Sequence, residues 1–460
     1  MTSASISFAQ GDYWTEYANA QPAVSTNVGS ISIVNDNVVW CNNGCGTANC
    51  TAIRRYSRSV NSGLNWTTGV VDLGAASQSL EISNISGTSA STAYVSAHPK
   101  ANVSAIGGVW KTTDGGLTWN RQATATYGSN DSFANLVHFF DANNGVTMGD
   151  PDGGYFEIYT TSNGGTTWTR VPSSNIPLPL FGPAPTLRPE FGLTNQYTVT
   201  GDAIWIGTTN GRILKSVNRG LNWTITQSPI PDFGGGENGT TSGDLAFTDV
   251  NNGLLLTNEY SLYGTSDGGV TWTEITYAGV DGNEPTLGNF GLSEIPGLPN
   301  AYVAVGIDLL NDPVRGSYYT INGGLNWTVI NDNPDLNYVD GGVISFYSPT
   351  VGFAGGFSTS AAIGGIFKWN GNDLYLANTK FSSDNKFSIS PNPTTGKFTL
   401  AGANIKQVQV IDILGKVIFN NNYSSLSNVE INLENTNSGI YMVKVTNDAS
   451  NTSVIKVVKQ

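Results

Sequence analysis

The octapeptide Thr112-Thr113-Asp114-Gly115-Gly116-Leu117-Thr118-Trp119 decides the fold, because its pattern occurs six times in the chain. Each copy reads Ser/Thr-x-Asp/Asn-x-Gly-x-Thr/Asn-Trp. The other five copies span residues 59–66, 161–168, 216–223, 265–272 and 320–327. Successive copies lie 49 to 55 residues apart, and a period of this length indicates an array of similar supersecondary units.

The residues around the octapeptide predict a β-hairpin. Residues 109–112 alternate like a strand, residues 113–117 form a glycine-rich turn, and the returning strand begins at Thr118. The Asp114 carboxyl can accept hydrogen bonds from N–H groups of the turn, and Trp119 can cover it. The same structural roles are expected in every copy at Asn61, Trp66, Asp114, Trp119, Asn163, Trp168, Asn218, Trp223, Asp267, Trp272, Asn322 and Trp327.

The composition favours an all-β protein that does not bind nucleic acid. Short alternating apolar runs are separated by Gly, Asn and Asp, and no run approaches the roughly 18 apolar residues of a membrane span. Residues 1–379 hold 13 Lys and Arg against 29 Asp and Glu. This acidic balance argues against binding nucleic acid or an anionic membrane by charge. It is also common among secreted proteins, so it does not by itself indicate a cationic partner.

Each octapeptide is preceded by two further strands in addition to the one that enters its turn. The clearest example is residues 136–140 and 146–148, which are separated by a turn at 141–145. The octapeptide therefore closes a unit of four strands.

A seventh unit lacks the octapeptide. Residues 343–347, 352–356 and 365–369 supply three strands and no fourth. Residues 13–17 imitate the strand around Trp168 and can supply the missing one. Pairing the first strand of the chain with the last would close a ring and remove two exposed strand edges.

The repeat resembles the Asp box, or BNR repeat, of sialidase-like β-propellers. The strands before each copy are similar to those of the propellers of photosystem II assembly factors. The resemblance implies a seven-bladed β-propeller over residues 11–376, with each box between the third and fourth strands of a blade. It also places the boxes away from the functional face, so their Asp and Asn side chains are expected to be structural. Four of the six are Asn, which further argues against a metal ladder.

A second domain is expected after a polar linker at residues 377–386. Residues 387–460 contain Pro391-Asn392-Pro393, later Gly439-Ile440-Tyr441, and an alternating C-terminal strand. This segment resembles the C-terminal sorting domain of the type IX secretion system of Bacteroidetes. The resemblance implies an immunoglobulin-like β-sandwich, the secretion machinery as a partner, and a secreted or outer-membrane-surface location. Strand patterning alone leaves open an adhesive or carbohydrate-binding sandwich.

The N-terminus and the cysteines are consistent with export. Residues 1–10 are interpreted as the remnant of a signal peptide. The three cysteines, Cys41, Cys45 and Cys50, lie in one short loop without a second ligand cluster, which favours a local disulfide over a metal site. Which two of them pair, and which thiol remains free, stays open.

Candidate site residues lie in the long connections that would face away from the boxes. Loops on a rigid scaffold usually carry function. The binding candidates are Phe181, Arg188, Phe233, Arg315 and Tyr338. A glycosidase needs two carboxyl groups about 5–10 Å apart. The catalytic candidates are therefore the carboxyl groups Asp150, Asp152, Glu237, Glu284 and Asp312. In so acidic a domain, some carboxylates will line a channel by chance.

Several other chemistries find little support in the sequence. A sialidase needs an arginine triad and a Tyr–Glu nucleophile pair, and only Arg188, Arg212 and Arg315 are dispersed enough. The two histidines, His98 and His138, have no companion ligands nearby in sequence. No phosphate-binding loop or serine-nucleophile elbow occurs. No metal and no cofactor are therefore expected.

The leading functional hypothesis is a secreted or surface-displayed monomeric propeller that binds a glycan or a protein without catalysis. The alternative is an extracellular glycoside hydrolase that uses paired loop carboxylates on a polysaccharide. A third possibility is an assembly factor for a surface complex. Fold resemblance alone cannot rank the three firmly.

Overall fold

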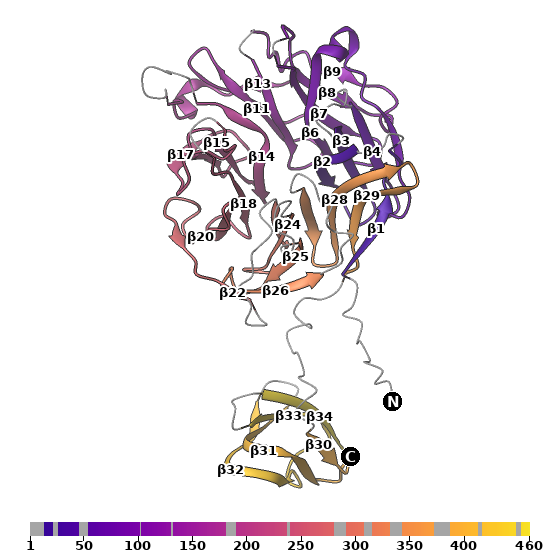
Figure 1. Cartoon of the computed structure of the whole chain (residues 1–460), viewed down its shortest axis with the longest axis vertical. Helices are drawn as coiled ribbons and strands as arrows, with labels where there is room; N and C mark the ends of the chain where they lie inside the picture. The colour runs from indigo at the N-terminus through magenta and orange to yellow at the C-terminus, as the bar shows by residue number, and fades with distance from the viewer. Residues whose placement is uncertain are drawn as a thin grey trace, which may run out of the picture. The chain divides into compact units, whose positions relative to one another are not determined.

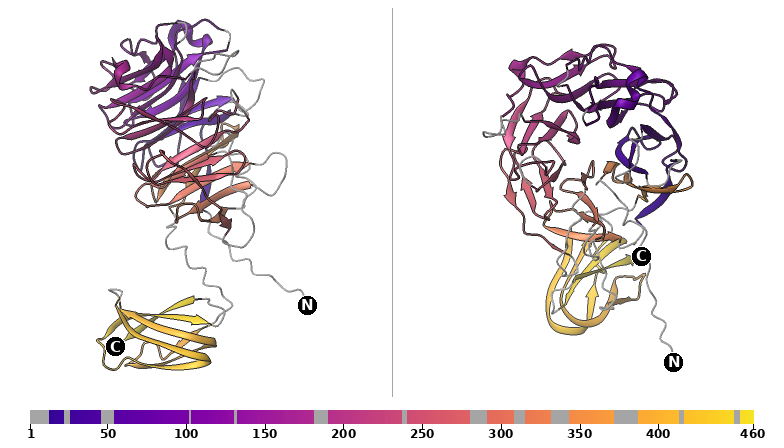
Figure 2. Two further views of the ribbon diagram at one scale, coloured as in Figure 1. Left: turned by 90° about the vertical axis from the view of Figure 1, so that its left-hand side faces the viewer. Right: turned by 45° about the horizontal axis from the view of Figure 1, so that its top comes forward.

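The computed structural model describes residues 13–21, 26–45, 54–101, 103–129, 132–180, 190–236, 240–279, 291–307, 315–331, 343–371, 387–412, 416–447 and 452–460. The chain forms two compact units, Met1–Leu374 and Tyr375–Gln460. The first is a ring of antiparallel sheets, and the second is a small β-domain (Figures 1 and 2). The expected linker at 377–386 and the expected signal-peptide remnant at 1–10 lie outside the described residues.

Seven blades surround a central axis, as the right-hand view of Figure 2 shows. This confirms the predicted all-β, seven-bladed fold. Blade 1 consists of β2 (Thr26–Ile33), β3 (Val39–Cys45), β4 (Arg55–Ser59) and β5 (Thr67–Val70). Blade 2 consists of β6 (Leu80–Gly87), β7 (Ala93–Pro99), β8 (Gly108–Thr112) and β9 (Asn120–Arg121). Blade 3 consists of β10 (Ala134–Phe139), β11 (Gly145–Asp152), β12 (Tyr155–Thr161) and β13 (Thr169–Arg170).

The next three blades repeat this order of strands. Blade 4 consists of β14 (Gly192–Thr200), β15 (Ala203–Thr208), β16 (Arg212–Ser216) and β17 (Thr224–Gln227). Blade 5 consists of β18 (Gly243–Phe247), β19 (Gly253–Thr257), β20 (Leu262–Thr265) and β21 (Thr273–Glu274). Blade 6 consists of β23 (Gly291–Glu294), β24 (Tyr302–Ile307), β25 (Arg315–Thr320) and β26 (Asn326–Asn331). The short β22 (Ala278–Gly279) adds a parallel edge to β26. Two 3-10 turns, η1 (Gly74–Ser79) and η2 (Ser173–Asn175), lie between blades.

The alternating strand directions give the ring two different ends. All six octapeptide turns join third to fourth strands, at the end where first strands also turn into second strands; we call this end the turn face. The opposite end, the loop face, carries the connections between second and third strands and those from one blade to the next. Every innermost strand therefore begins at the loop face.

The octapeptide turns satisfy their own hydrogen bonds, as predicted. In the second turn, Asp114 Oδ1 accepts from Thr118 N at 2.9 Å, and the Thr112 hydroxyl accepts from Gly116 N at 2.9 Å. These hydrogen bonds to the charged form lower the pKa of Asp114 to about 2. Gly115 and Gly116 have φ of 78° and 95°, which favours glycine. The equivalents of the Gly116–Thr112 bond occur in all six turns.

The tryptophan that ends each turn is buried or nearly so. The indole N–H of Trp119 donates to Gly116 O at 3.1 Å, and Trp66, Trp223 and Trp327 make the same bond. In the remaining two turns, the buried indole nitrogens of Trp168 and Trp272 have no hydrogen-bond partner. The tryptophan thus covers its turn by packing in every copy, and the hydrogen bond is an addition in four.

The turns also attach each blade to the one before it. The Tyr56 hydroxyl of blade 1 donates to Gly115 O of blade 2 at 3.1 Å. Tyr94 donates to Gly164 O at 2.8 Å, and the Trp205 indole to Gly268 O at 3.0 Å, at the same position of later turns. The carbonyl of this buried glycine is therefore an acceptor for an aromatic side chain of the neighbouring blade.

Side chains also connect the innermost strands of successive blades. These strands diverge, so they cannot form a continuous backbone ladder, and their edge N–H and C=O groups need other partners. Ser30 Oγ accepts from Ile85 N at 3.1 Å, and Asn84 Oδ1 accepts from Val137 N at 2.9 Å. Further along the ring, Asp244 Oδ2 accepts from Leu292 N at 2.9 Å. These bonds fix the spacing of the strands that surround the axis.

The seventh blade closes the ring as predicted. It contains β27 (Ile344–Ser348), β28 (Val351–Ser360) and β29 (Ile363–Trp369), and the N-terminal β1 (Trp14–Ala18) pairs with β29 as its outermost strand. Trp14 is 5% exposed, packs edge-on against Trp369 and Phe346, and donates to Ser317 Oγ of blade 6 at 2.9 Å. In addition, β2 pairs with the end of β28, which joins blades 1 and 7.

The second unit has its own core. Its strands are β30 (Ser388–Ser390), β31 (Lys397–Asp412), β32 (Val417–Asn432), β33 (Gly439–Asn447) and β34 (Thr452–Lys459). Register shifts divide β31 into two segments, of which the first pairs with β30 and the second with β33. Alternate residues of β33 are buried, as expected for a sheet with one face in a core.

Thr112→Ala is expected to destabilise the propeller by about 1–3 kcal/mol, because it leaves the buried Gly116 N–H without an acceptor. Thr112→Ser keeps the hydroxyl that two natural copies supply as Ser59 and Ser216, and should cost less than about 1 kcal/mol. Urea unfolding of both variants measures the difference. Equal losses would show that the hydroxyl does not hold the turn.

Trp14→Ala is expected to lower the unfolding free energy of the propeller by about 3–5 kcal/mol, since the ring loses a buried aromatic side chain at its closure. The control is Leu117→Ala on a side chain that is 83% exposed, which should change stability by no more than about 0.5 kcal/mol. Thermal and urea unfolding are the measurements. A Trp14 variant as stable as the control would mean that β1 does not close the ring.

Candidate functional site

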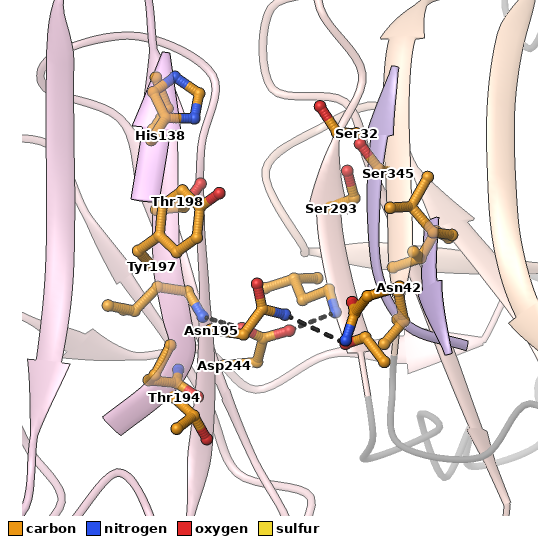
Figure 3. A pocket seen from close by; sticks show the side chains of 18 of the residues that line it. Ser32, Asn42, His138, Thr194, Asn195, Tyr197, Thr198, Asp244, Ser293 and Ser345 are labelled. Carbon is orange, nitrogen blue, oxygen red and sulfur yellow. Dashed lines mark hydrogen bonds between the residues drawn. The ribbon is translucent and has the colours of Figure 1, made fainter. Parts of the chain in front are cut away.

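A cavity of about 750 Å³ lies at the centre of the ring and is lined by the innermost strands of all seven blades. Its wall is rich in hydroxyl and amide groups, several of which Figure 3 shows on opposite sides of the cavity. The labelled examples are Ser32, Asn42, His138, Thr194, Asn195, Tyr197, Thr198, Asp244, Ser293 and Ser345. Among the described residues that line it, none is Lys or Arg. The cavity thus offers many hydrogen-bonding groups and no positive charge.

An irregular segment of blade 4 crosses this cavity. The register between β14 and β15 shifts between Gly192 and Tyr197, and Asn195 has a φ of 57°. Such bulges re-aim side chains and are frequent beside functional sites. Asn195 Nδ2 donates to Gly29 O of blade 1 at 3.4 Å, and the Tyr197 hydroxyl accepts from Asn84 Nδ2 of blade 2 at 3.2 Å. We call residues 192–197 the β14 bulge.

The β14 bulge also contacts blade 5. Gln196 Nε2 donates to Gly243 O at 3.0 Å, and the Gln196 side chain hydrogen-bonds to Asp244. Blade 4 therefore reaches three other blades from one segment. A ligand that enters from the loop face meets this segment instead of an open channel.

Two carboxyl groups lie in the cavity wall beside the bulge. Asp244 of β18 accepts hydrogen bonds from Leu292 N and Leu245 N, both at 2.9 Å, and burial raises its pKa to about 6. Glu294 of β23 is on the adjacent strand, and burial together with the charge of Asp244 raises its pKa to about 8. The two carboxyls are neighbours on one side of the cavity, not partners across it.

A second cavity of about 630 Å³ opens between blades 2 and 3, and Asp150 is part of its wall. Asp150 Oδ1 accepts from Asn135 Nδ2 at 2.7 Å as well as from Gly192 N. Burial outweighs these bonds and raises the pKa of Asp150 to about 7. This carboxyl is therefore partly protonated near neutral pH, the property that a general acid requires.

Asp152 has a different environment from Asp150. It forms an ion pair with Arg170 at 3.1 Å, and the Arg170 guanidinium lies over the Tyr155 ring at 4.3 Å from its centroid. The predicted Asp150 and Asp152 candidates are thus brought to the same loop, but Asp152 is held by an arginine and serves the packing of that loop.

Most other predicted site residues lie outside the described part of the chain. These are Phe181, Arg188, Glu237, Glu284, Asp312 and Tyr338, together with the side chain of Arg315. Phe233 is described, lines the central cavity and is 2% exposed. Its ring packs in the core between blades 4 and 5, beneath Gly207, where a Cβ atom would come within 2.5 Å of it. Phe233 therefore supports the wall of the cavity.

The arginines do not form a free triad in the described residues. Arg212 makes a buried ion pair with Glu190, a residue with no exposed side-chain surface. Arg121 and Arg170 follow octapeptide turns in the sequence, but their guanidinium groups reach toward the loop face and contact Gly107 O and Asp152. In both residues, the long side chain extends back along its own strand. Arg219 stays at the turn face, in ion pairs with Asp141 and Asp202.

A Tyr–Glu hydrogen bond of blade 3 lies in the core. The Tyr159 hydroxyl donates to Glu157 Oε1 at 2.7 Å, but the two residues are 3% and 1% exposed. A nucleophile must reach its substrate. Tyr159 and Glu157 therefore stabilise blade 3 and do not supply the pair that a sialidase uses.

Both histidines are neutral at pH 7. Burial lowers the pKa of His98 and of His138 to about 4. The Ser83 hydroxyl donates to Ala134 O at 2.5 Å, so His98 Nδ1 donates to Ser83 Oγ across 2.8 Å. His138 packs edge-on against Phe140 and Tyr197. The described residues contain no cluster of three or more His, Cys, Asp or Glu that could hold a metal.

Cys41 is a free thiol in the core of blade 1. It is fully buried, and desolvation raises its pKa. The predicted local disulfide therefore remains possible between Cys45 and Cys50 only, and the side chain of Cys45 and all of Cys50 lie outside the described residues.

Sequence reasoning missed Asp244, Glu294 and the β14 bulge. Asp244 directly precedes the apolar run 245–247 of β18. Its position on that strand could have placed it in the cavity wall. Glu294 and the bulge left no comparable signal, because their positions depend on strand register.

The C-terminal unit matches a known family. Residues 388–460 match the family described as a secretion system C-terminal sorting domain. The protein is therefore an exported β-propeller protein, which the type IX secretion machinery carries to the cell surface or out of the cell. The helices among the described residues are short 3-10 turns, and none is long and apolar enough to cross a membrane.

Solved structures support the propeller fold. A structure described as YCF48 bound to D1 peptide has a TM-score of 0.51 and 14% identity, and the alignment covers 78% of this chain and 96% of that one. YCF48 from Cyanidioschyzon merolae gives 0.48 and 14%, with 78% and 99% covered. A Trypanosoma rangeli sialidase gives 0.41 and 13%, with 94% and 83% covered. At 14% identity, the similarity to the first structure indicates a shared fold and nothing about function. The other two structures have TM-scores below 0.5, and no conclusion is drawn from them. No curated protein matches the sequence.

Asp150→Asn is expected to flatten the pH dependence of stability. The folded-state pKa of about 7 lies above an unfolded value of about 3.9, so the wild type loses stability as the pH rises from about 4 to about 7. Asparagine keeps an acceptor oxygen without the charge and should reduce this loss by about 1–3 kcal/mol. Urea unfolding at pH 4.5 and pH 8 tests this. Parallel profiles for the two proteins would contradict the raised pKa.

Proposed function

We propose that the protein is a non-catalytic binding module, exported to the cell surface or released, which holds a glycan in its central cavity. The observation that carries the proposal is the composition of the cavity wall. Hydroxyl and amide groups from several blades converge there, including Ser32, Asn42, Thr198, Ser293 and Ser345. A volume of about 750 Å³ lies within the range of small-ligand sites, which is about 300–1,000 Å³.

The arrangement of carboxyls favours binding over hydrolysis. A glycosidase places two carboxyls on opposite sides of the scissile bond. Asp244 and Glu294 are on neighbouring strands instead, and Asp244 is already occupied by two backbone N–H groups and Gln196. The pair therefore lacks the opposed geometry that hydrolysis needs.

An aromatic side chain at the cavity could help to bind a sugar ring. Tyr347 of β27 lines the cavity and is 43% exposed. Its neighbour on the same strand, Phe346, is buried. An exposed ring of this kind offers an apolar surface for the CH face of a sugar. Protein ligands remain an alternative, since hydroxyl and amide groups also bind backbone peptide groups.

A glycoside hydrolase remains the alternative function, and one observation favours it. Asp150 has a pKa of about 7 and lines the second cavity, on the loop face. A hydrolase would also need a second carboxylate, and the sequence candidates Glu237, Glu284 and Asp312 lie outside the described residues. Asp150→Asn should abolish any hydrolysis found with a polysaccharide panel while leaving glycan binding in the central cavity intact.

Ser345→Trp is expected to block glycan binding, because the larger side chain would fill the central cavity. On a glycan array and by calorimetry, the full-length wild type should bind without releasing shortened products, and the variant should bind at least about tenfold more weakly. Leu117→Trp on the turn face is the control and should bind like the wild type. Unchanged binding by a folded Ser345 variant would exclude the central cavity as the site.

A further inference from the structure

Glu294 differs from the other carboxyl of the cavity in its hydrogen bonds. Asp244 is saturated by two backbone N–H groups and the Gln196 side chain. Glu294 lies in the wall of the same cavity, and the interaction resolved for its carboxyl within the described chain is with its own backbone N–H. The Glu294 carboxyl therefore has acceptor capacity left for a ligand in this cavity.

The surroundings of Glu294 are negative or neutral on every strand that packs against it. β18 contributes Asp244, β24 contributes Tyr302, and β27 contributes Tyr347. The described wall contains no Lys or Arg, and His138 is neutral. A carboxylate taken out of water without a cation is costly, so a positively charged ligand group would offset the cost of ionising Glu294.

The β14 bulge determines how a ligand can reach this carboxyl. Because Asn195 and Tyr197 bridge from blade 4 to blades 1 and 2, a long chain cannot pass freely along the axis. β23 begins at the loop face with Gly291 and ends at Glu294, so Glu294 lies further along the axis toward the turn face than Leu292, which bonds to Asp244. A ligand that reaches Glu294 would therefore do so end-on, with its terminal unit inside the cavity.

We infer that the central cavity binds the terminal unit of a glycan that carries a free amino group, with the ammonium group against Glu294 and the sugar hydroxyls on the surrounding Ser, Thr, Asn and Gln side chains. This inference rests on the proposed function and names its ligand class. A lysine side chain presents the same ammonium group, but a single alkyl chain would leave most of the hydroxyl and amide groups of the wall without partners. The polar lining therefore favours the amino sugar.

A matched pair of ligands tests the inference. Oligomers of glucosamine and of N-acetylglucosamine of equal length differ in the charge of the amino group and in the acetyl group. Calorimetry with the full chain at pH 7 should show that the glucosamine trimer binds at least about tenfold more tightly, which corresponds to one charge-assisted hydrogen bond. Equal affinities for the two trimers would overturn the inference and leave the proposed glycan binding intact.

Glu294→Gln tests the residue assigned to the ammonium. The variant keeps the size and hydrogen-bonding capacity of the side chain and removes the charge, so the preference for the glucosamine trimer should disappear while binding of the N-acetylated trimer is retained. Asp244→Asn, which affects a saturated carboxyl, should reduce the preference less. A preference that survives in Glu294→Gln would overturn the assignment.

Two further outcomes separate the inference from the proposed function. Binding of neither trimer, nor of any glycan on an array, by a protein with normal thermal unfolding would overturn both. Tight binding of a lysine-containing peptide, lost in Glu294→Gln and accompanied by no affinity for amino sugars, would overturn the inferred ligand class. Circular dichroism of each variant establishes that it is folded before its affinity is interpreted.

Discussion

The structure depends on hydrogen bonds that side chains of one innermost strand make to the backbone of the next. Neighbouring blades diverge around the axis, so their innermost strands cannot share a continuous ladder. Ser30, Asn84 and Asp244 replace it by accepting from backbone N–H groups of the following blade. The result is a ring whose centre is held by polar side chains, with the apolar cores displaced outward between the sheets. Because these polar side chains surround the axis, the cavity at the centre of the ring is lined by hydroxyl and amide groups.

The same requirement explains how structure and site overlap. Asp244 connects blades 5 and 6 through Leu292 N. Burial raises the pKa of Asp244 and that of Glu294, and the charge of Asp244 raises the pKa of Glu294 further. The β14 bulge gives up regular pairing with β15 and gains contacts with three other blades. The residues that hold the ring at these points therefore also define the shape and charge of the cavity.

The octapeptide made the architecture predictable because its function is local. Each copy holds its turn with a hydrogen bond between a Ser or Thr hydroxyl and a glycine N–H within its own eight residues, so its sequence specifies its structure directly. The unpaired seventh unit and the strand at Trp14 were recognisable for the same reason. Residues 388–460 carried an equally specific signature.

The cavity could not be predicted in this way, since its chemistry depends on register between distant strands. Glu294 is one acidic residue among many in the sequence, and only the position of β23 beside β18 gives it a special environment. The sequence also does not show where a long side chain ends: Arg170 contacts Asp152 from a strand that begins at the other end of the blade.

The closure of the ring in blade 7 has a mechanical consequence. β29 is the last described strand before the C-terminal unit, and it is paired with β1 on one side and β28 on the other. Two sets of hydrogen bonds therefore hold it, and it cannot be peeled away as a free edge strand.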